Sequence, residues 1–282
     1  VEIAGTFGLG AKRWIRVFGL SIQPSELIKI TLILALAKYY HDLRFDRIGK
    51  IYNLIFPLLI IMIPFGLIVT QPDLGTSITI LLLGGMIMFC AGVRLWKFLI
   101  AFISLSISFP LLWNFIKPYQ QKRILSFLNP DSDPLGQGYQ LIQSKIGLGS
   151  GGISGKGFLN GSQSYLEFLP EKQTDFIFSL IGEEFGFIGT IFIIFLYLCL
   201  ILTGYYISLK SNHIFGKILS IGISINLFIY VLLNIGMVIG VLPIVGLPLP
   251  LISYGGTALL SIMISFGFLL NIHIYDKIKN FN

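Results

Sequence analysis

The stretch that decides the fold is "DFIFSLIGEEFGFIGTIFIIFLYLCLILTG", residues 175–204. After its first residue, the only charged side chains in it are Glu183 and Glu184. The rest is apolar and longer than the roughly 17–25 residues that a helix needs to cross the hydrocarbon core of a bilayer. Carboxylates inside such a span are costly and usually face a cavity or a partner. The stretch therefore predicts a membrane helix with a polar site near its start.

The composition extends this prediction to the whole chain. Its 282 residues are 55% hydrophobic and 12% charged, whereas ordinary soluble domains carry about 25% charge. The apolar residues fall in long blocks, so the predicted fold class is an all-α polytopic membrane protein, built as a single membrane domain. The three histidines are scattered and predict no metal cluster. The membrane, and not nucleic acid, is the expected surroundings of the chain.

Seven apolar runs are predicted to span the membrane. They cover residues 23–39, 52–70, 74–92, 96–116, 175–204, 216–241 and 254–275. The large loop, residues 117–174, contains the glycine-rich stretch 138–158, which predicts a short surface helix followed by a glycine turn. Residues 241–256 hold too many prolines and glycines for a regular helix. The chain starts at Val1 with no signal peptide, so we expect a fragment or a processed product.

An odd number of spans would put the two chain ends on opposite sides of the membrane. Nine Lys and Arg residues then share the side of the large loop, and ten lie on the other side, all in short loops or tails. Because the positive-inside rule weighs short loops most, the large loop is predicted to be extracytoplasmic and the other face cytoplasmic. The nine outward cations either solvate a loop, which the counts alone favour, or handle an anionic ligand.

Asp175 is the first candidate for chemistry. It follows the helix breaker Pro170 and stands, with Thr174, where a helix N-cap belongs. A capping aspartate accepts backbone N–H bonds and suits the helix dipole, and this structural role is the simpler interpretation. The alternative is a general base at the outer edge of the membrane, which the same dipole keeps ionised. The two roles are compatible because a cap also fixes a carboxylate in space.

The two deeper carboxylates are expected to serve different faces of the same helix. At about 100° per residue, Glu183 lies about 80° and Glu184 about 180° from Asp175 around the helix axis. Both cannot share the face of Asp175. At least one of them is therefore expected to form an ion pair or hydrogen bond with another helix.

The start of the first span holds another group of charges. Glu26 and Lys29 are three residues apart and so share a helix face, where they form either a local ion pair or the rim of a polar cavity. Lys12, Arg13 and Trp14 precede the span. They are either an interfacial border, which is common in membrane proteins, or a phosphate clamp, because arginine matches phosphate geometry.

Longer motifs resemble a known family. They read "GAKRWI" (10–15), "QPSELIK" (23–29), "QPDLGTSI" (71–78), "LEFLPEKQTDFIFSLIGEEFG" (166–186) and "NIGMVIGVLPIVGLPLPLISYGG" (234–256). Together they resemble the SEDS family of cell-wall proteins (shape, elongation, division, sporulation), and within it the rod-shape elongation branch. Gln173 stands where that family commonly has histidine. The family has ten spans, so the resemblance implies that this chain carries the fourth to the tenth.

The resemblance implies an enzyme of the cytoplasmic (inner) membrane. It would be a peptidoglycan glycosyltransferase that polymerises lipid II into β-1,4 glycan strands at the extracytoplasmic face during cell elongation. Asp175 matches the family's essential aspartate and would be the general base of one inverting displacement. The expected substrate-binding residues, which include cations for the departing pyrophosphate, are Lys12, Arg13, Trp14, Glu26, Lys29, Lys117, Lys145, Lys156, Glu171 and Lys172.

The resemblance also implies partners. A class B penicillin-binding protein and further proteins of the elongation complex are expected to assemble with the chain. A divalent cation, Mg²⁺ or Mn²⁺, stays open because no ligand motif is found. Two other functions stay open as well: a lipid II flippase or transporter, which suits broken helices and polar residues within spans, and a non-catalytic scaffold. Charges gathered toward the side of the large loop favour surface chemistry.

Overall fold

The computed structural model of the protein describes residues 6–8, 11–17, 20–71, 73–114, 116–134, 136–162, 169, 171 and 173–279. Its chain divides into two units. The first comprises residues 1–101, 200–229 and 256–282, and the second comprises residues 102–199 and 230–255. Each unit is therefore built from segments that are far apart in the sequence.

Seven helices occupy the ranges that the sequence predicts as spans. They are α1 (Pro24–Asp42), α2 (Ile51–Thr70), α3 (Leu74–Cys90), α4 (Leu95–Trp113), α8 (Ile177–Lys210), α9 (Ile214–Ile239) and α10 (Gly256–Lys279). Helices α2, α8, α9 and α10 are long and apolar enough to cross a membrane, while α3 and α4 are shorter apolar helices. A polytopic, mostly helical membrane protein is thus confirmed, and the count of seven spans stays a prediction.

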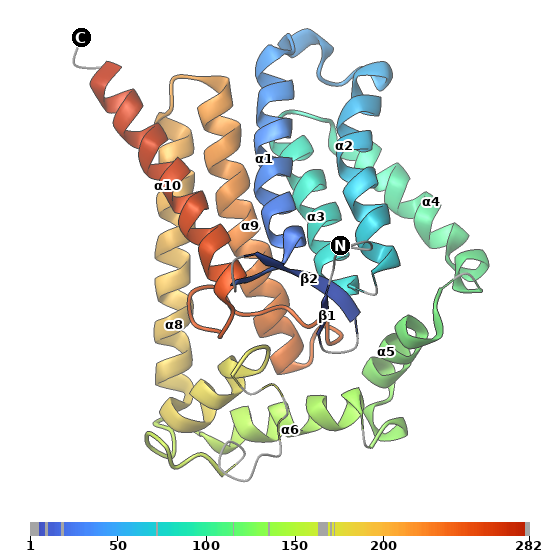
Figure 1. Cartoon of the computed structure of the whole chain (residues 1–282), viewed down its shortest axis with the longest axis vertical. Helices are drawn as coiled ribbons and strands as arrows, with labels where there is room; N and C mark the ends of the chain where they lie inside the picture. Colours follow the sequence, from blue (N-terminus) through green and yellow to red (C-terminus); the bar gives the residue numbers. More distant parts are fainter. Residues whose placement is uncertain are drawn as a thin grey trace. The chain divides into compact units, whose positions relative to one another are not determined.

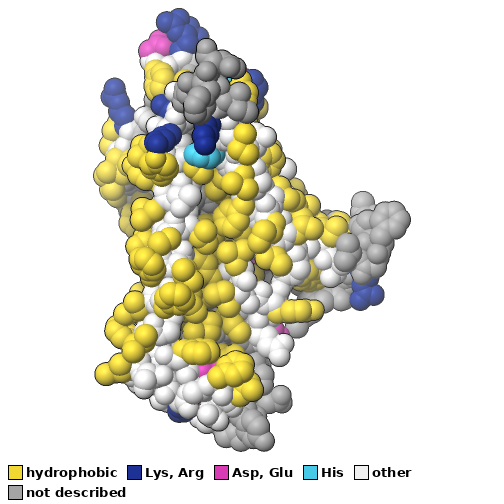
Figure 2. Space-filling model, turned by 90° about the vertical axis from the view of Figure 1, so that its left-hand side faces the viewer, with side chains coloured by type: hydrophobic (Ala, Val, Ile, Leu, Met, Phe, Trp, Pro, Cys, Tyr) yellow, Lys and Arg dark blue, Asp and Glu magenta, His cyan; other side chains and the backbone are white. Residues whose placement is uncertain are grey.

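The surface of the long helices is apolar. Figure 2 shows a face on which exposed hydrophobic side chains are numerous. On α8, for example, Phe187, Phe192 and Phe195 are all exposed. Soluble monomers rarely expose apolar patches of this extent, and lipid tails remove the cost of exposing them.

In the first unit, α1, α2 and α3 pack side by side, and α10 also contacts α1 (Figure 1). Residues on the inner faces of these helices, such as Ile33, Leu36 and Ile87, are fully buried. A 3-10 turn, η1 (Phe45–Arg47), lies between α1 and α2. This packing brings the N-terminal end of α1 close to Asp73 at the start of α3 and to Ser261 of α10.

The first unit also contains a small sheet that the sequence did not predict. Strands β1 (Thr6–Gly8), β2 (Ala11–Val17) and β3 (Leu20–Ile22) pair antiparallel in the order β1-β2-β3. The segment that was expected to be either an interfacial border or a phosphate clamp before the first span is strand β2. Aromatic and β-branched residues such as Trp14, Ile15 and Val17 favour this extended conformation.

In the second unit, part of the predicted large loop is helical. It forms α5 (Pro118–Leu128), the 3-10 turn η2 (Pro130–Ser132) and α6 (Gln137–Ser150), with turn residues 151–154 after α6. A short helix followed by a glycine turn is therefore present where it was predicted, and its place at the membrane surface stays a prediction. Asp133 joins α5 to α6, because its carboxylate accepts from the Gln137 N–H at 3.0 Å and pairs with Lys122 at 3.1 Å.

Helix α8 is interrupted at Gly186, whose φ of 65° and ψ of −161° are not helical. The residues that follow α6 form hydrogen bonds with the backbone groups of α8 on both sides of the interruption. The N–H groups of Lys156 and Gly157 donate to the carbonyls of Glu183 and Glu184, both at 3.0 Å. In return, the N–H groups of residues 187 and 188 donate to the carbonyls of residues 152 and 153 at 2.9 and 3.2 Å. An interrupted helix is tolerated at membrane depth when protein satisfies the freed backbone groups in this way.

Candidate active site

Asp175 lies in the turn that leads into α8. Because α8 begins at Ile177, the cap position is Phe176, whose carbonyl accepts from the N–H of Leu180 at 3.4 Å. The predicted cap at Thr174 or Asp175 is therefore wrong by at least one residue. Because Asp175 lies outside α8, the helical angles predicted from Asp175 to Glu183 and Glu184 do not apply. Asp175 is half-buried and precedes the cap. Its position is set by the turn, and not by the helix.

Asn234 of α9 holds this turn through the backbone. Its side chain is 0% exposed, and its Nδ2 donates to the carbonyl oxygen of Asp175 at 2.9 Å and to that of Leu247 at 2.7 Å. One amide thus ties the turn of Asp175 to the loop of residues 240–255, which we call the proline loop. Because the bond goes to the main chain, it fixes the aspartate without using its carboxylate.

The proline loop holds the two preceding residues in the same manner. The Ser253 hydroxyl donates to the carbonyl of Thr174, and the Tyr254 N–H donates to the carbonyl of Gln173 at 2.9 Å. The Ser253 oxygen also accepts from the N–H of Leu249 at 2.7 Å, which closes the loop on itself. The carbonyls of three consecutive residues, 173–175, are therefore bonded to α9 or to the proline loop.

The carboxylate of Asp175 lies against Gly246. A methyl group on Gly246 would lie 3.3 Å from Oδ2 of Asp175, and the φ of Gly246 is +69°. Glycine adopts this left-handed conformation without steric cost and leaves room for the close approach. The turn itself has a second left-handed residue, Glu171, with a φ of +60°, which is uncommon for a residue with a side chain. Such backbone strain is concentrated at functional sites.

Sequence reasoning named Asp175 as a candidate but did not predict the residues that hold its turn. Asn234, Gly246 and Ser253 all fall in the motif of residues 234–256, which was used only to identify the family. The signal was a polar residue within an apolar helix, followed by a loop of sixteen residues with three prolines and three glycines. Their partners could not be inferred, because the hydrogen bonds connect residues 59 and 79 positions apart.

Glu183 is a buried carboxylate that forms an ion pair with the partly exposed Lys156. The Glu183 side chain is 1% exposed and its Oε1 lies 2.7 Å from Nζ of Lys156. The Ser162 hydroxyl donates to the same oxygen at 2.9 Å. The expectation that one of the deep carboxylates pairs internally is confirmed, although the partner comes from the turn after α6 and not from a helix. Lys156, a predicted pyrophosphate ligand, already has its charge balanced in this structure.

The other predicted substrate-binding residues of the second unit are exposed where the structure describes them. Lys145 is exposed on α6, and the end of its side chain packs over Gly240. Lys117 is exposed at the start of α5. The Glu171 carboxylate, also exposed, accepts from the Thr174 hydroxyl at 2.9 Å. Lys172 lies outside the described residues.

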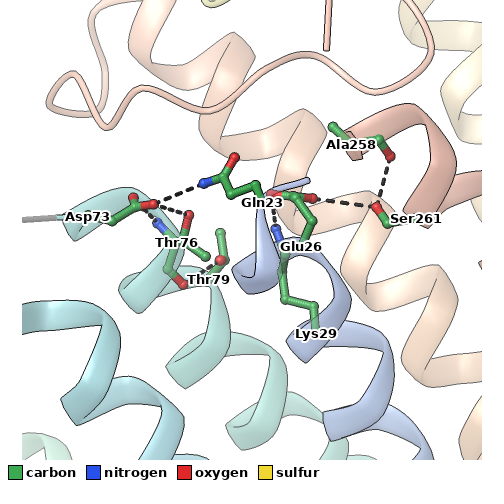
Figure 3. A network of polar contacts seen from close by, with 8 residues as sticks. All are labelled: Gln23, Glu26, Lys29, Asp73, Thr76, Thr79, Ala258 and Ser261. Atoms are coloured by element: carbon green, nitrogen blue, oxygen red, sulfur yellow. Dashed lines mark hydrogen bonds and ion pairs between the residues drawn. The ribbon is translucent and has the colours of Figure 1, made fainter. Parts of the chain in front are cut away.

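In the first unit, Glu26 and Lys29 form the predicted ion pair. Nζ of Lys29 lies 2.6 Å from Oε1 of Glu26, and the two side chains are only 1% and 4% exposed (Figure 3). The other oxygen of Glu26 accepts from the Ser261 hydroxyl of α10 at 3.5 Å. The local pair is thus confirmed, and a role at the rim of a cavity stays a prediction.

A carboxylate that the sequence analysis did not single out lies close to this pair. Asp73 caps α3, where its carboxylate accepts from the N–H of Thr76 at 3.1 Å and from its hydroxyl at 3.0 Å. Nε2 of Gln23 also donates to Asp73 at 3.3 Å, which links the start of α3 to the start of α1 (Figure 3). Trp14 is half-buried on β2. The side chains of Lys12 and Arg13 lie outside the described residues.

The described residues contain no group of three or more His, Cys, Asp or Glu side chains arranged to hold a metal ion. They therefore supply no ready-made site for the divalent cation that the sequence left open.

Long apolar helices, an interrupted helix and an anchored aspartate together define a polytopic membrane protein with a candidate catalytic turn. The family model of FtsW, RodA and SpoVE, described as "Cell cycle protein", matches residues 1–278. The chain is 43% identical over 279 residues to the peptidoglycan glycosyltransferase MrdB of Escherichia coli K12, covering 98% of this chain and 75% of that relative. This chain belongs to the FtsW/RodA/SpoVE family.

Solved structures agree with this assignment. A chain of a peptidoglycan synthase complex that coordinates polymerization and crosslinking superposes with a TM-score of 0.82 at 32% identity, covering 97% of this chain and 76% of that one. The rod shape determining protein RodA of Thermus thermophilus superposes with a TM-score of 0.67 at 25% identity, covering 96% of this chain and 72% of that one. The SEDS fold expected from the motifs is thereby confirmed.

Proposed function

We propose that the protein is a peptidoglycan glycosyltransferase of the inner membrane, which polymerises lipid II into β-1,4 glycan strands with Asp175 as general base. The observation that carries the proposal is the turn of residues 173–175, whose three carbonyls are bonded to α9 and the proline loop. This arrangement fixes a half-buried carboxylate without neutralising it through those bonds. The glycosyltransferase relatives in the same family support the reaction class.

The proposed reaction is a single displacement. The Asp175 carboxylate takes the proton of the acceptor sugar's 4-hydroxyl, and that oxygen forms a bond to the anomeric carbon of the donor. The bond from this carbon to the pyrophosphate oxygen breaks, and undecaprenyl pyrophosphate leaves with the electron pair. One displacement inverts the α-linked donor to a β-linkage, so one base suffices and no covalent intermediate is needed.

The departing pyrophosphate requires positive charge at the same site. Lys117 and Lys145, both exposed in the same unit as Asp175, are the candidates among the described residues. Lys156 is a weaker candidate because Glu183 balances its charge. Lys12, Arg13 and Lys172 stay candidates on sequence grounds. Fixed cations stabilise a leaving group most when they are already oriented before the reaction.

We also propose a partner that crosslinks the new strands. The structurally similar chain belongs to a peptidoglycan synthase complex that coordinates polymerization and crosslinking, which supports such a partner. We assign this role to a class B penicillin-binding protein, within the elongation complex. A divalent cation beside the pyrophosphate would add charge neutralisation, but the described residues do not define its ligands.

Asp175→Asn tests the proposal. This isosteric change keeps the backbone bonds of the turn and removes the base, so polymerisation of purified lipid II should fall by about 10²–10⁴-fold, the usual share of a general base. The matched control is Asp131→Asn, which removes an exposed carboxylate from η2 in the same unit and should leave the rate unchanged. Normal strand synthesis by Asp175→Asn, in protein that elutes as a folded monodisperse species, would refute the mechanism.

A flippase is the second candidate, because the interruption of α8 at Gly186 resembles the broken helices of transporters. Reconstitution in liposomes with labelled lipid II separates the two functions. The glycosyltransferase forms polymers with or without movement of lipid II between leaflets. A flippase moves lipid II and forms none, and a scaffold does neither without its partner.

A further inference from the structure

A pocket of about 620 Å³ lies in the first unit, where η1 meets the N-terminal ends of α2 and α4. Lys50, Arg94 and Lys97 line it, together with the aromatic residues Tyr52 and Trp96. Helix α1 separates it from the Glu26–Lys29 pair, since its 19 residues extend about 28 Å at about 1.5 Å per residue. The pocket is thus distinct from the polar network at the other end of α1.

The charges that line the pocket are not balanced within it. Asp46 is the one carboxylate in the described lining, and it already pairs with Arg44 at 3.5 Å. Lys97 donates to the carbonyl of Gly49 and lies 5.7 Å from the centre of a Trp96 ring. Among the residues that the structure describes, the Lys50 and Arg94 side chains have neither a hydrogen-bond nor an ion-pair partner. A ligand with negative charge would balance these two cations.

The helix ends add to the same preference. Lys50 is the N-cap residue of α2, and Arg94 directly precedes the first residue of α4. Neither helix has an acidic residue in its first turn. The first N–H groups of a helix lack partners within it and carry partial positive charge, so both helix starts favour an anion beside them.

The residues around the pocket indicate which kind of molecule would contain the anionic group. Trp96 and Tyr52 are exposed, as aromatic residues are at the boundary between membrane and water. Beyond the pocket, the apolar side chains of Ile55 on α2 and Leu99 on α4 are also exposed. A free phosphate ion would make no use of these apolar surfaces, whereas the acyl chains of a lipid would cover them.

We infer that this pocket binds the phosphate headgroup of an anionic phospholipid, with the acyl chains along α2 and α4. The pocket belongs to the loops of the predicted cytoplasmic face, where anionic lipids meet basic residues. The inference does not rest on the proposed glycosyltransfer, because none of the pocket residues belongs to the turn of Asp175.

Native mass spectrometry of the delipidated, purified protein tests the inference. The probes are phosphatidylglycerol and phosphatidylcholine with identical acyl chains. The wild-type protein should bind phosphatidylglycerol more tightly. Each Lys or Arg near an anionic surface is worth a factor of about five, so Lys50→Gln/Arg94→Gln should weaken that binding by about 25-fold and leave phosphatidylcholine binding unchanged.

The matched control is Lys210→Gln/Lys277→Gln, which removes two exposed cations of the same unit that do not line the pocket. It should retain the preference. Equal binding of the two lipids by the wild type, or an equal loss in both double variants, would overturn the inference. If the double variant does not fold, the single changes Lys50→Gln and Arg94→Gln should each weaken phosphatidylglycerol binding about fivefold.

Inorganic phosphate separates a lipid from a soluble ion. At millimolar concentration it should not displace phosphatidylglycerol from the wild-type protein, because it lacks the acyl chains. Complete displacement would identify a phosphate site and make the lipid assignment wrong. The readout is binding alone, so it is unaffected by whether Asp175 acts as a base.

Discussion

The two units hold a carboxylate at the start of a helix in two different ways. Glu26 in the first unit is 4% exposed and paired with Lys29 at 2.6 Å. Asp175 in the second unit is half-buried, and its bond to Asn234 uses the main-chain carbonyl. The Glu26 carboxylate is buried and in direct contact with Lys29, so it helps to pack and orient the helices of the first unit. The turn of Asp175 is instead held through main-chain carbonyls, so these bonds position the carboxylate without using its oxygens.

The largest expected effect comes from breaking the pair in the first unit. Lys29→Met would leave Glu26 as an uncompensated buried charge, which should lower the free energy of unfolding by about 3–5 kcal/mol. Glu26→Gln/Lys29→Met removes both charges and should recover most of the loss. Thermal unfolding of the purified variants in detergent measures the difference.

The exposed pair of Lys38 and Asp42 supplies the control, since its side chains are 65% and 58% exposed. Lys38→Met should change the free energy of unfolding by less than about 1 kcal/mol. If Lys29→Met and Glu26→Gln/Lys29→Met unfold at the same temperature, removing the Glu26 charge gives no recovery. The ion pair would then not be what compensates the buried Glu26.

Asn234→Ala removes the tether of the second unit. It leaves the carbonyls of Asp175 and Leu247 without their buried donor, which should cost about 1–3 kcal/mol. Because misplacement of a catalytic group by 1 Å can cost about 10²-fold, the rate of lipid II polymerisation should fall by about 10–100-fold, mainly in kcat and little in KM. Steady-state kinetics measures the split.

Asn226→Ala is the control, because Asn226 is another buried asparagine on α9. It should lower stability without the selective loss of kcat. An Asn234→Ala protein with normal kcat would show that the turn holds Asp175 without this amide.

Gly246→Ala should have a smaller effect. The added methyl group would lie 3.3 Å from Oδ2 of Asp175, and an alanine at a φ of +69° is strained by about 1 kcal/mol. We expect a several-fold lower polymerisation rate and a slightly lower unfolding temperature. Gly66→Ala, inside α2 with nothing within 4 Å of the added methyl, should be neutral or stabilising. Equal rates for both variants would contradict the close approach of the carboxylate.

The smallest effect concerns Asp133, outside the spans. The hydrogen bond from Lys122 lowers the pKa of Asp133, and the bond from the Gln137 N–H lowers it further, although partial burial opposes them. Since the folded pKa lies below the ordinary value, the stabilisation is present above that value and is lost as the pH falls through the folded pKa. Hydrogen exchange of residues 118–150 should be faster in Asp133→Asn at neutral pH. The difference should shrink below about pH 4. A difference that persists in acid would show that charge is not its cause.

The sequence was sufficient where the signal is local. Long apolar blocks give the seven helices, and spacing of three residues gives the Glu26–Lys29 pair. It was insufficient where bonds connect distant residues. Glu183 and Glu184 mark a polar site locally, but they do not show that α8 is interrupted at Gly186. The pairing of Lys156 with Glu183 joins residues 27 positions apart. The strands of residues 6–22 were missed because such short segments carry too little alternation to be distinguished from a membrane border.

The interruption of α8 has a consequence for biogenesis. Four backbone hydrogen bonds connect the turn of residues 151–157 to residues 183–188. These bonds satisfy the backbone groups that the interruption of α8 leaves unpaired, so the turn and the start of α8 complete each other. The two segments therefore fold together, and a ribosome that has delivered residue 157 still has to deliver residue 188 before either is complete.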